Sequence, residues 1–256
     1  MSRCRVLLVG ESWVSAATHY KGFDQFGTVT FHLGAEPLAR ALADSEVELT
    51  WMKAHDAASD FPLALADLQA FDAVVLSDLG ANTLLLHPEV WLHGRPVANR
   101  LELLRSYVEA GGGLAMIGGY FSFQGINGAA RWHKTPVEEV LPVACLAVDD
   151  RLEVPEGFAA ERTGTDHPIL AGLDGDWPLL LGLNEVTAKP DATLLLRTPA
   201  AQGGHPLLAV GAYGRGRTLA WTSDIGPHWL PQPFVDWPGY GRLWRQAFSW
   251  LAGRGD

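Results

Sequence analysis

The stretch at residues 111–125, GGGLAMIGGYFSFQG, decides how the chain folds. Its three leading glycines end a helical pattern, where a positive backbone φ is needed and glycine supplies it at little steric cost. The apolar run at residues 114–117 is typical of a central parallel strand that is covered on both faces. Gly118 and Gly119 then end the strand in a tight turn that presents Tyr120. Many α/β enzymes present a nucleophile at such a turn, and this chain has neither Cys nor Ser at that position.

On the amino-terminal side of this stretch, apolar runs alternate with helical patterns. Strands are expected at residues 5–10, 47–52 and 71–77, and helices at 36–44, 60–68 and 99–110. Consecutive strands joined by helices form a parallel sheet with right-handed crossovers. The sequence therefore predicts a three-layer, doubly wound α/β fold. Residues 14–33 lack a clear period, and we expect an irregular loop there that closes over a ligand pocket.

The pattern changes in the second half of the chain. A short helix at 137–141 and an extended segment at 143–154 precede a loop at 163–173. Short strands at 184–188, 192–198, 206–213 and 217–223 are separated by turns rich in Gly, Pro and Asp, which predicts an antiparallel extension of the sheet. A helix at 240–251 closes the pattern. Because no linker or internal repeat interrupts it, we expect a single domain over residues 1–256.

Polar and glycine residues follow three of the predicted parallel strands. They are Glu11 after the first, Ser77 and Asp78 after the third, and Gly118, Gly119 and Tyr120 after the fourth. Ligands of such sheets bind beyond the carboxyl ends of the strands, so these residues predict a small-molecule site. Each also has a structural interpretation: a cap or loop anchor for Glu11, turn chemistry for Ser77 and Asp78, and close packing for the glycines.

A second hypothesis is acid/base chemistry. Its candidates are Glu11, His19, His167, Asp224 and His228. Two of them within hydrogen-bond reach in a cleft would favour a hydrolase or lyase. The alternative for His167, which precedes Pro168, is a loop anchor. No His-x-x-x-His spacing occurs, so we expect no metal site, and we expect no cofactor.

Composition excludes several classes of partner. The net charge of the 256 residues is −10 and no Lys/Arg cluster occurs, which disfavours nucleic acid. No apolar run approaches the ~20 residues of a membrane span.

The two cysteines, Cys4 and Cys145, suggest no disulfide framework and fit a reducing cytoplasm. Five of the ten tryptophans follow residue 220, which favours an aromatic core and a subunit interface, and we expect a homo-oligomer.

Several segments together resemble the glutamine amidotransferase-like family, which consists mostly of bacterial cytoplasmic proteins. They are the initial alternation of strands and helices, GGGLAMIGG at 111–119, TDHPILAGL at 165–173 and YGRGRTLAWTSDIGPHW at 213–229. Some of these segments recur in trehalose-utilisation-like proteins. The resemblance covers nearly the whole chain. It implies the flavodoxin-like fold of the class I glutamine amidotransferase-like superfamily, with a nucleophile elbow after the fourth strand.

The sequence departs from the active members of that superfamily. They carry Cys in a G-x-C-x-G turn and a His-x-Glu pair downstream, and the thiolate attacks the amide of glutamine. Here Tyr120 takes the place of the Cys, and no His-x-Glu follows it. A phenol with a pKa of ~10 is no substitute at neutral pH. We therefore expect a small-molecule-binding family member without glutaminase activity. A hydrolase or lyase, or a structural oligomer, are the alternatives, and the sequence does not identify the ligand.

Overall fold

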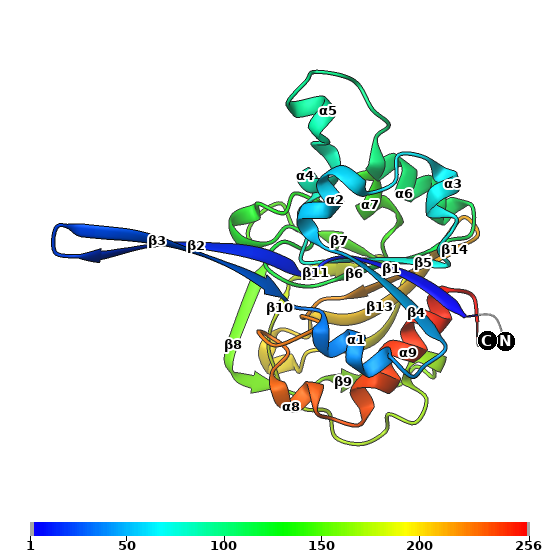
Figure 1. Ribbon diagram of the computed structural model, residues 1–256. Helices are drawn as coiled ribbons and strands as arrows, with labels where there is room; N and C mark the ends of the chain where they lie inside the picture. The colour runs from blue at the N-terminus through cyan, green and yellow to red at the C-terminus, as the bar shows by residue number, and fades with distance from the viewer. Residues whose placement is uncertain (1–2, 255–256) are drawn as a thin grey trace.

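The central sheet has eight strands in the order β4-β1-β5-β6-β14-β13-β12-β9, in a computed structural model that describes residues 3–254 (Figure 1). Five neighbouring strands are parallel: β1 (Cys4–Gly10), β4 (Val47–Met52), β5 (Ala73–Ser77), β6 (Gly113–Ile117) and β14 (Gly216–Trp221). In their spatial order, β4-β1-β5-β6-β14, they are the second, first, third, fourth and fifth parallel strands along the chain. That order is the flavodoxin-like one. The predicted mostly parallel α/β sheet is confirmed.

Three antiparallel strands continue the sheet beyond β14: β13 (Pro206–Tyr213), β12 (Thr193–Arg197) and β9 (Glu161–Arg162). The strand predicted at 184–188 is not part of it. The chain there forms β10 (Leu180–Asn184) and β11 (Val186–Ala188) instead. β10 pairs with β8 (Arg151–Phe158) and β11 with β7 (Val143–Cys145), so the predicted extended segment contributes to two separate two-stranded sheets.

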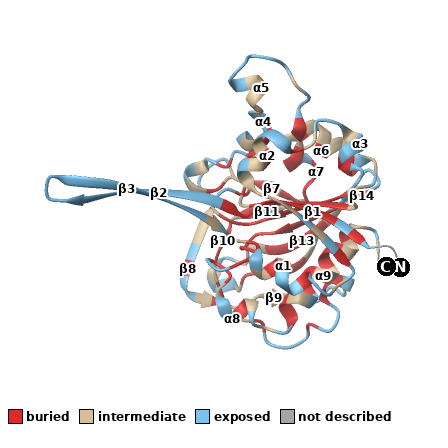
Figure 2. Cartoon of the chain, in the orientation of Figure 1, coloured by how far each residue is buried: buried red, intermediate tan, exposed pale blue. Residues whose placement is uncertain are grey.

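Helices cover both faces of the central sheet (Figure 1). One layer contains α1 (Glu36–Leu42) and α9 (Gly239–Leu251), and the other α2 (Ala54–Asp60), α3 (Leu65–Leu68), α4 (Ala81–Leu85), α6 (Arg100–Glu109) and α7 (Pro136–Val140). The short elements α5 (Pro88–Trp91), α8 (Gln232–Val235), η1 (Ile126–Gly128), η2 (Pro168–Leu170) and η3 (Ala200–Gln202) lie in the connections. Each face of the sheet has its own apolar core, shown as buried in Figure 2. The core against α9 contains Trp221 and Trp244, both fully buried.

Two segments differ locally from the expectation. The helix predicted at 60–68 is absent as such, because α2 ends at Asp60 and α3 starts at Leu65. Phe61 between them is extended (ψ 136°), the backbone favoured by a residue that precedes proline, here Pro62. Among residues 3–254, no helix is both long and apolar enough to span a bilayer.

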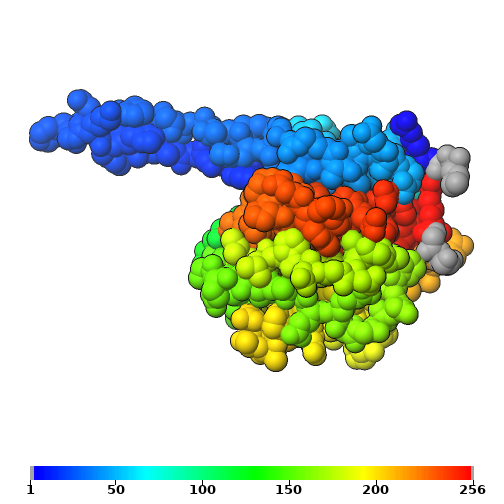
Figure 3. All heavy atoms as spheres, turned by 90° about the horizontal axis from the view of Figure 1, so that it is seen from below, coloured from blue at the N-terminus to red at the C-terminus, as the bar shows by residue number. Residues whose placement is uncertain are grey.

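The prediction of an irregular loop at residues 14–33 is wrong. β2 (Ser12–Lys21) and β3 (Asp24–Leu33) pair antiparallel over their whole length and project from the body as a long hairpin (Figures 1 and 3). The turn between them places Gly22 at φ 67°, as expected of a two-residue hairpin turn. The alternating run Thr28–Val29–Thr30–Phe31 and this Gly-Phe turn were the available sequence signals.

The turn after β6 leaves no room for a side chain at its first residue. The amide of Gly118 donates to the carbonyl of Trp221 at 2.7 Å, so the chain passes close to the end of β14. A Cβ on Gly118 would lie 2.2 Å from the carbonyl oxygen of Thr222. Glycine is therefore required here by backbone packing.

We expect Gly118→Ala to destabilise the protein, because backbone atoms rather than a flexible side chain must move. Overpacking of this kind costs about 3 kcal/mol, which corresponds to a loss of roughly 6 °C or more in Tm for a chain of this size. Thermal unfolding followed by circular dichroism measures it. Gly175→Ala is the matched control, since a Cβ there meets nothing within 4 Å. Equal Tm values for the two variants would contradict the packing argument.

Candidate functional site

A cavity of about 580 Å³ lies beyond the carboxyl ends of β1, β5, β6 and β14. Its lining includes the acids Glu11, Asp78 and Asp224 and the imidazole of His228, and its apolar and aromatic walls include Trp13, Val14, Tyr120, Phe121 and Pro227. The lining contains no Lys and no Arg. The predicted strand-end position of the pocket thus coincides with a group of carboxylates.

Glu11 follows β1 and is buried, with a positive φ of 51°. Its Oε1 accepts a hydrogen bond from the hydroxyl of Ser77 at 2.5 Å. Burial, then the nearby charge of Asp78, raises the pKa of Glu11 well above its ordinary value. Gly34 makes room for this carboxyl group, because a Cβ there would lie 2.5 Å from Oε2 of Glu11.

Asp78 occupies the equivalent position after β5, also with a positive φ, of 45°. Its Oδ1 accepts from the amide of Phe121 at 2.7 Å, and its own amide donates to the hydroxyl of Ser122 at 3.1 Å. Burial raises the pKa of Asp78 to about 6. Positive φ values are uncommon outside glycine and cluster at functional sites. Two adjacent strand ends therefore both present an acid in a strained backbone.

Asp224 and His228 form a hydrogen-bonded pair across the same cavity. Nδ1 of His228 lies 2.8 Å from Oδ2 of Asp224, which also accepts from the amide of Trp229 at 2.7 Å. The hydrogen bond to Asp224 raises the pKa of His228. Because Nδ1 is engaged, Nε2 is the ring nitrogen left to exchange a proton with a ligand.

Tyr120 stands over the elbow between this pair and β8. Its ring packs edge-on against His228 with a centroid separation of 4.6 Å, and its hydroxyl donates to Oε1 of Glu153 at 3.2 Å. Burial and the charge of Glu153 raise the pKa of the phenol. The guanidinium of Arg151 lies 5.3 Å from the centre of the ring. Tyr120 is thus a neutral wall of the cavity.

Sequence reasoning missed the residues that hold the elbow in place. The side chain of Asn184 bonds both backbone groups of Gly119, accepting from its amide at 3.0 Å and donating to its carbonyl at 3.1 Å. Asp150 accepts from Asn184 at 2.8 Å and from the amides of Gln124 and Gly125. These contacts span 25 to 65 positions of sequence, so no local pattern marks them.

Other candidates lie outside the cavity lining. Ser77, Gly118 and Gly119 lie beneath it, and Ser77 reaches it through its bond to Glu11. His19 is on the projecting hairpin, stacked on Phe26. His167 caps η2, where its Nδ1 accepts from the amide of Ile169 at 3.3 Å, as expected of a loop anchor. The structure therefore brings together Glu11, Asp78, Tyr120, Asp224 and His228.

Both cysteines lie away from the cavity, and both are free and buried. Burial raises the pKa of the Cys4 thiol to about 11 and raises that of Cys145 further. Within residues 3–254, no group of three or more His, Cys, Asp or Glu side chains is placed to hold a metal ion.

Strand order, elbow and strand-end cavity define a flavodoxin-like α/β protein. Residues 5–253 match the family model described as "Putative glutamine amidotransferase". The chain belongs to this glutamine amidotransferase-like family, which confirms the resemblance.

Solved structures agree. One described as a cytoplasmic protein from Salmonella typhimurium is 39% identical, with a TM-score of 0.91 over 96% of this chain and 98% of that one. A second, from strain LT2, is 37% identical, with a TM-score of 0.92 over 96% and 99%. A ThuA-like protein from Parabacteroides merdae, 12% identical with a TM-score of 0.58 over 98% and 91%, shares the fold alone. A search of curated proteins found no match.

We expect Glu11→Gln to stabilise the protein increasingly as pH rises. The native state holds the Glu11 proton more tightly than the unfolded chain does. Protonated Glu11 therefore contributes its full stabilisation of the native state below pH 4.5, and this stabilisation is lost as pH rises through the raised native pKa of Glu11. Glutamine keeps an acceptor for Ser77 and has no charge to desolvate. The Tm difference from wild type should therefore grow between pH 5 and pH 8. Glu48→Gln, on an exposed position of β4, is the control. A difference that does not change with pH would refute the buried-acid assignment.

Proposed function

We propose that this protein binds and transforms a neutral or cationic small molecule by acid/base chemistry, as a hydrolase or lyase, and is not a glutaminase. The observation that supports this most strongly is that the buried Glu11 and the half-buried Asp78, both with a strained backbone, share one cavity with the hydrogen-bonded pair Asp224–His228. Titratable groups whose environments set their pKa values apart are typical of acid/base sites.

Two features argue against glutamine as substrate. The elbow carries Tyr120, and the thiols of both cysteines are buried elsewhere with raised pKa values. Glutamine also carries an α-carboxylate, and the cavity lining offers it no Lys or Arg. An anion would instead meet three carboxyl groups. The family description therefore fits the ancestry of the fold better than the activity of this chain.

The cavity favours cationic or neutral ligands over anions. Carboxylates attract amines and other cations, or bind hydroxyl groups by accepting hydrogen bonds, and the aromatic walls suit the apolar part of a small molecule. The net charge of −10 adds a field that draws cations toward the protein.

The proton-transfer roles follow from the environment of each group. Glu11, kept protonated by burial, is the proton donor, and Ser77 orients its carboxyl group. His228, fixed through Nδ1 by Asp224, takes or returns a proton at Nε2. Asp78 changes charge near pH 6 and binds the polar end of the ligand. We further propose a cytoplasmic location, supported by the two Salmonella proteins that carry that description.

We expect no ammonia release from glutamine by the wild-type protein above the rate without protein. A coupled glutamate dehydrogenase assay measures it, with Cys4→Ser, Cys145→Ser and Tyr120→Phe in parallel. Release by wild type that one of these variants abolishes would show that the chain is a glutaminase.

We expect amines and polyols, rather than carboxylic acids, to raise the Tm in a thermal-shift panel of metabolites grouped by charge. A ligand at one hundred times its Kd stabilises by about 2.7 kcal/mol, or roughly 5 °C or more for a chain of this size. Binding of a cation should strengthen as pH rises through about 6, because Asp78 then becomes a carboxylate.

The variants Asp78→Asn and His228→Asn should weaken binding of such a ligand at least ~10-fold, the equivalent of losing one charged hydrogen bond. His167→Asn, in a separate surface hollow, is the matched control and should bind as wild type does. Preferential binding of carboxylic acids, or a loss confined to the His167 variant, would overturn the proposal.

A further inference from the structure

The projecting hairpin, residues 12–33, has two unlike faces; we call the hairpin the arm. The strand register places Val14, Ala16, Thr18, Tyr20, Gln25, Gly27, Val29, Phe31 and Leu33 on one side, which we call the apolar face. The opposite side has its own cover: Trp13 stacks on His32, and His19 stacks on Phe26.

Little in residues 3–254 covers the apolar face. Val29 and Tyr20 are 74% and 73% exposed, and Val14 is 59% exposed. Figures 2 and 3 show the arm extending alone into solvent, exposed along its length beyond the root. An isolated two-stranded hairpin is marginally stable in water and needs a third strand or a packed surface. The arm is therefore expected to have a partner.

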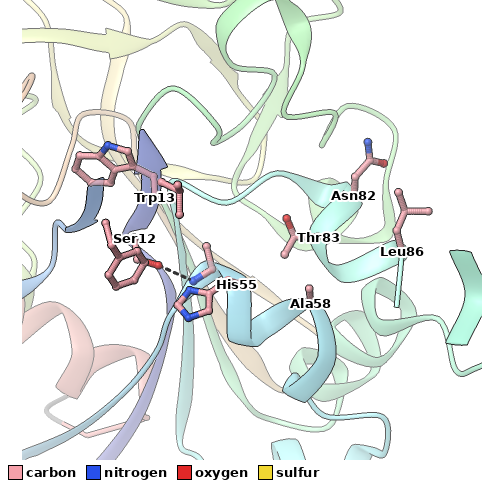
Figure 4. Close-up of a pocket in the computed structure, with 10 residues that line it drawn as sticks. Ser12, Trp13, His55, Ala58, Asn82, Thr83 and Leu86 are labelled. Carbon is pink, nitrogen blue, oxygen red and sulfur yellow. Dashed lines mark hydrogen bonds between the residues drawn. The ribbon is translucent and has the colours of Figure 1, made fainter. Parts of the chain in front are cut away.

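A hollow of about 490 Å³ lies where the apolar face meets the body (Figure 4). Its lining includes Val14 and Phe31 from the arm and His55, Ala58 and Leu86 from the body. The hydroxyl of Ser12 accepts from the amide of Ala54 at 2.8 Å and fastens the arm to α2. The α4–α5 region, which contributes Leu86 to the hollow, has further exposed apolar side chains. They are Leu85, Trp91 and Leu92.

We propose that the arm docks on a second copy of this chain, with its apolar face and tip packed against the partner's arm and the hollow at its root. The arm's ten-residue strands reach about 33 Å, enough to extend beyond the body that carries them. Phe23 at the tip is fully exposed, and Ala16, Thr18 and Gly27 form a low stripe that permits close approach. The same surface provides both the projecting arm and the hollow that would accept the partner's arm. Such a surface fits the self-complementary contact of a symmetric dimer.

The exposed apolar area approaches that of such an interface. Six large apolar side chains of the apolar face and tip are exposed: Val14, Tyr20, Phe23, Val29, Phe31 and Leu33. A fully exposed aromatic ring offers 150–250 Å², so these partly to fully exposed side chains supply on the order of 700 Å², close to the ~800 Å² that a stable interface takes from each partner.

Charge favours a second copy over other partners. The only Lys, Arg, Asp or Glu residues of the arm are Lys21 and Asp24, which face each other beside the turn. Nucleic acid or an anionic membrane would require a cluster of cations. Two bodies that each carry −10 repel one another, and the nearly neutral arm is a surface through which they can approach.

The test compares Val29→Glu with Thr30→Glu, adjacent exposed positions on opposite faces of β3. Light scattering after size exclusion gives the mass of each protein at micromolar concentration. We expect wild type and Thr30→Glu to contain at least two chains. Val29→Glu should be monomeric, with the dissociation constant raised at least ~10-fold because the interface would bury an unpaired charge. Both variants should keep the wild-type circular dichroism spectrum.

Hydrogen exchange provides a second measurement. The arm amides of concentrated wild type should exchange at least ~10-fold more slowly than those of Val29→Glu, because docking protects the hairpin. A monomeric wild type, equal masses for the two variants, or equal exchange rates would each overturn the inference. None of these outcomes depends on the acid/base proposal, whose test uses ligands.

Discussion

The carboxyl group of Glu11, held out of water at the end of β1, is the constraint around which the site is arranged. Its burial is tolerated because Ser77 donates to it and because the carboxyl group can remain protonated. It also needs space, which Gly34 provides, and a left-handed backbone, which few residues other than glycine adopt at low cost. Asp78 repeats the arrangement one strand away, with Gly119 beside its Oδ1. Strain at two adjacent strand ends points to selection for where these acids lie.

The antiparallel part of the structure is needed to hold that arrangement. Asn184 ends β10, and its amide group replaces the ladder partners that the turn at Gly119 lacks. Asp150, just before β8, gathers Asn184 and two amides of the elbow loop onto one carboxylate. Such a fully bonded buried network fixes a single conformation. The small β8–β10 sheet therefore acts as a brace for the elbow.

The sequence predicted most of the parallel sheet, because buried strands leave apolar runs and their ends leave glycine and acid residues. It also placed Glu11, Asp78 and Tyr120 at one edge, since parallel strands end on the same side. It could not supply Asn184 or Asp150, whose roles depend on contacts across dozens of residues. It misjudged residues 14–33, because small and polar residues such as Ser15 and Thr18 interrupt the alternation of large apolar ones in a hairpin that has no core to face. His19, His167 and His228 were all candidates in sequence, with a loop anchor as the alternative for His167, and the fold separates them.

The charges around the tyrosine at the elbow bear on the proposed acid/base chemistry. A catalytic thiolate forms where cations or a helix N-terminus lower the thiol pKa. Glu153 accepts from the hydroxyl of Tyr120, and Glu11, Asp78 and Asp224 line the same cavity, whereas Arg151 and His228 lie against its ring. The elbow presents a phenol in place of a thiol, and burial and the charge of Glu153 raise the pKa of that phenol. The same carboxylates suit a site that donates protons and attracts cations. The substitution at the elbow and the acids around it are therefore consistent with each other, and together they support the acid/base proposal over a degenerate glutaminase.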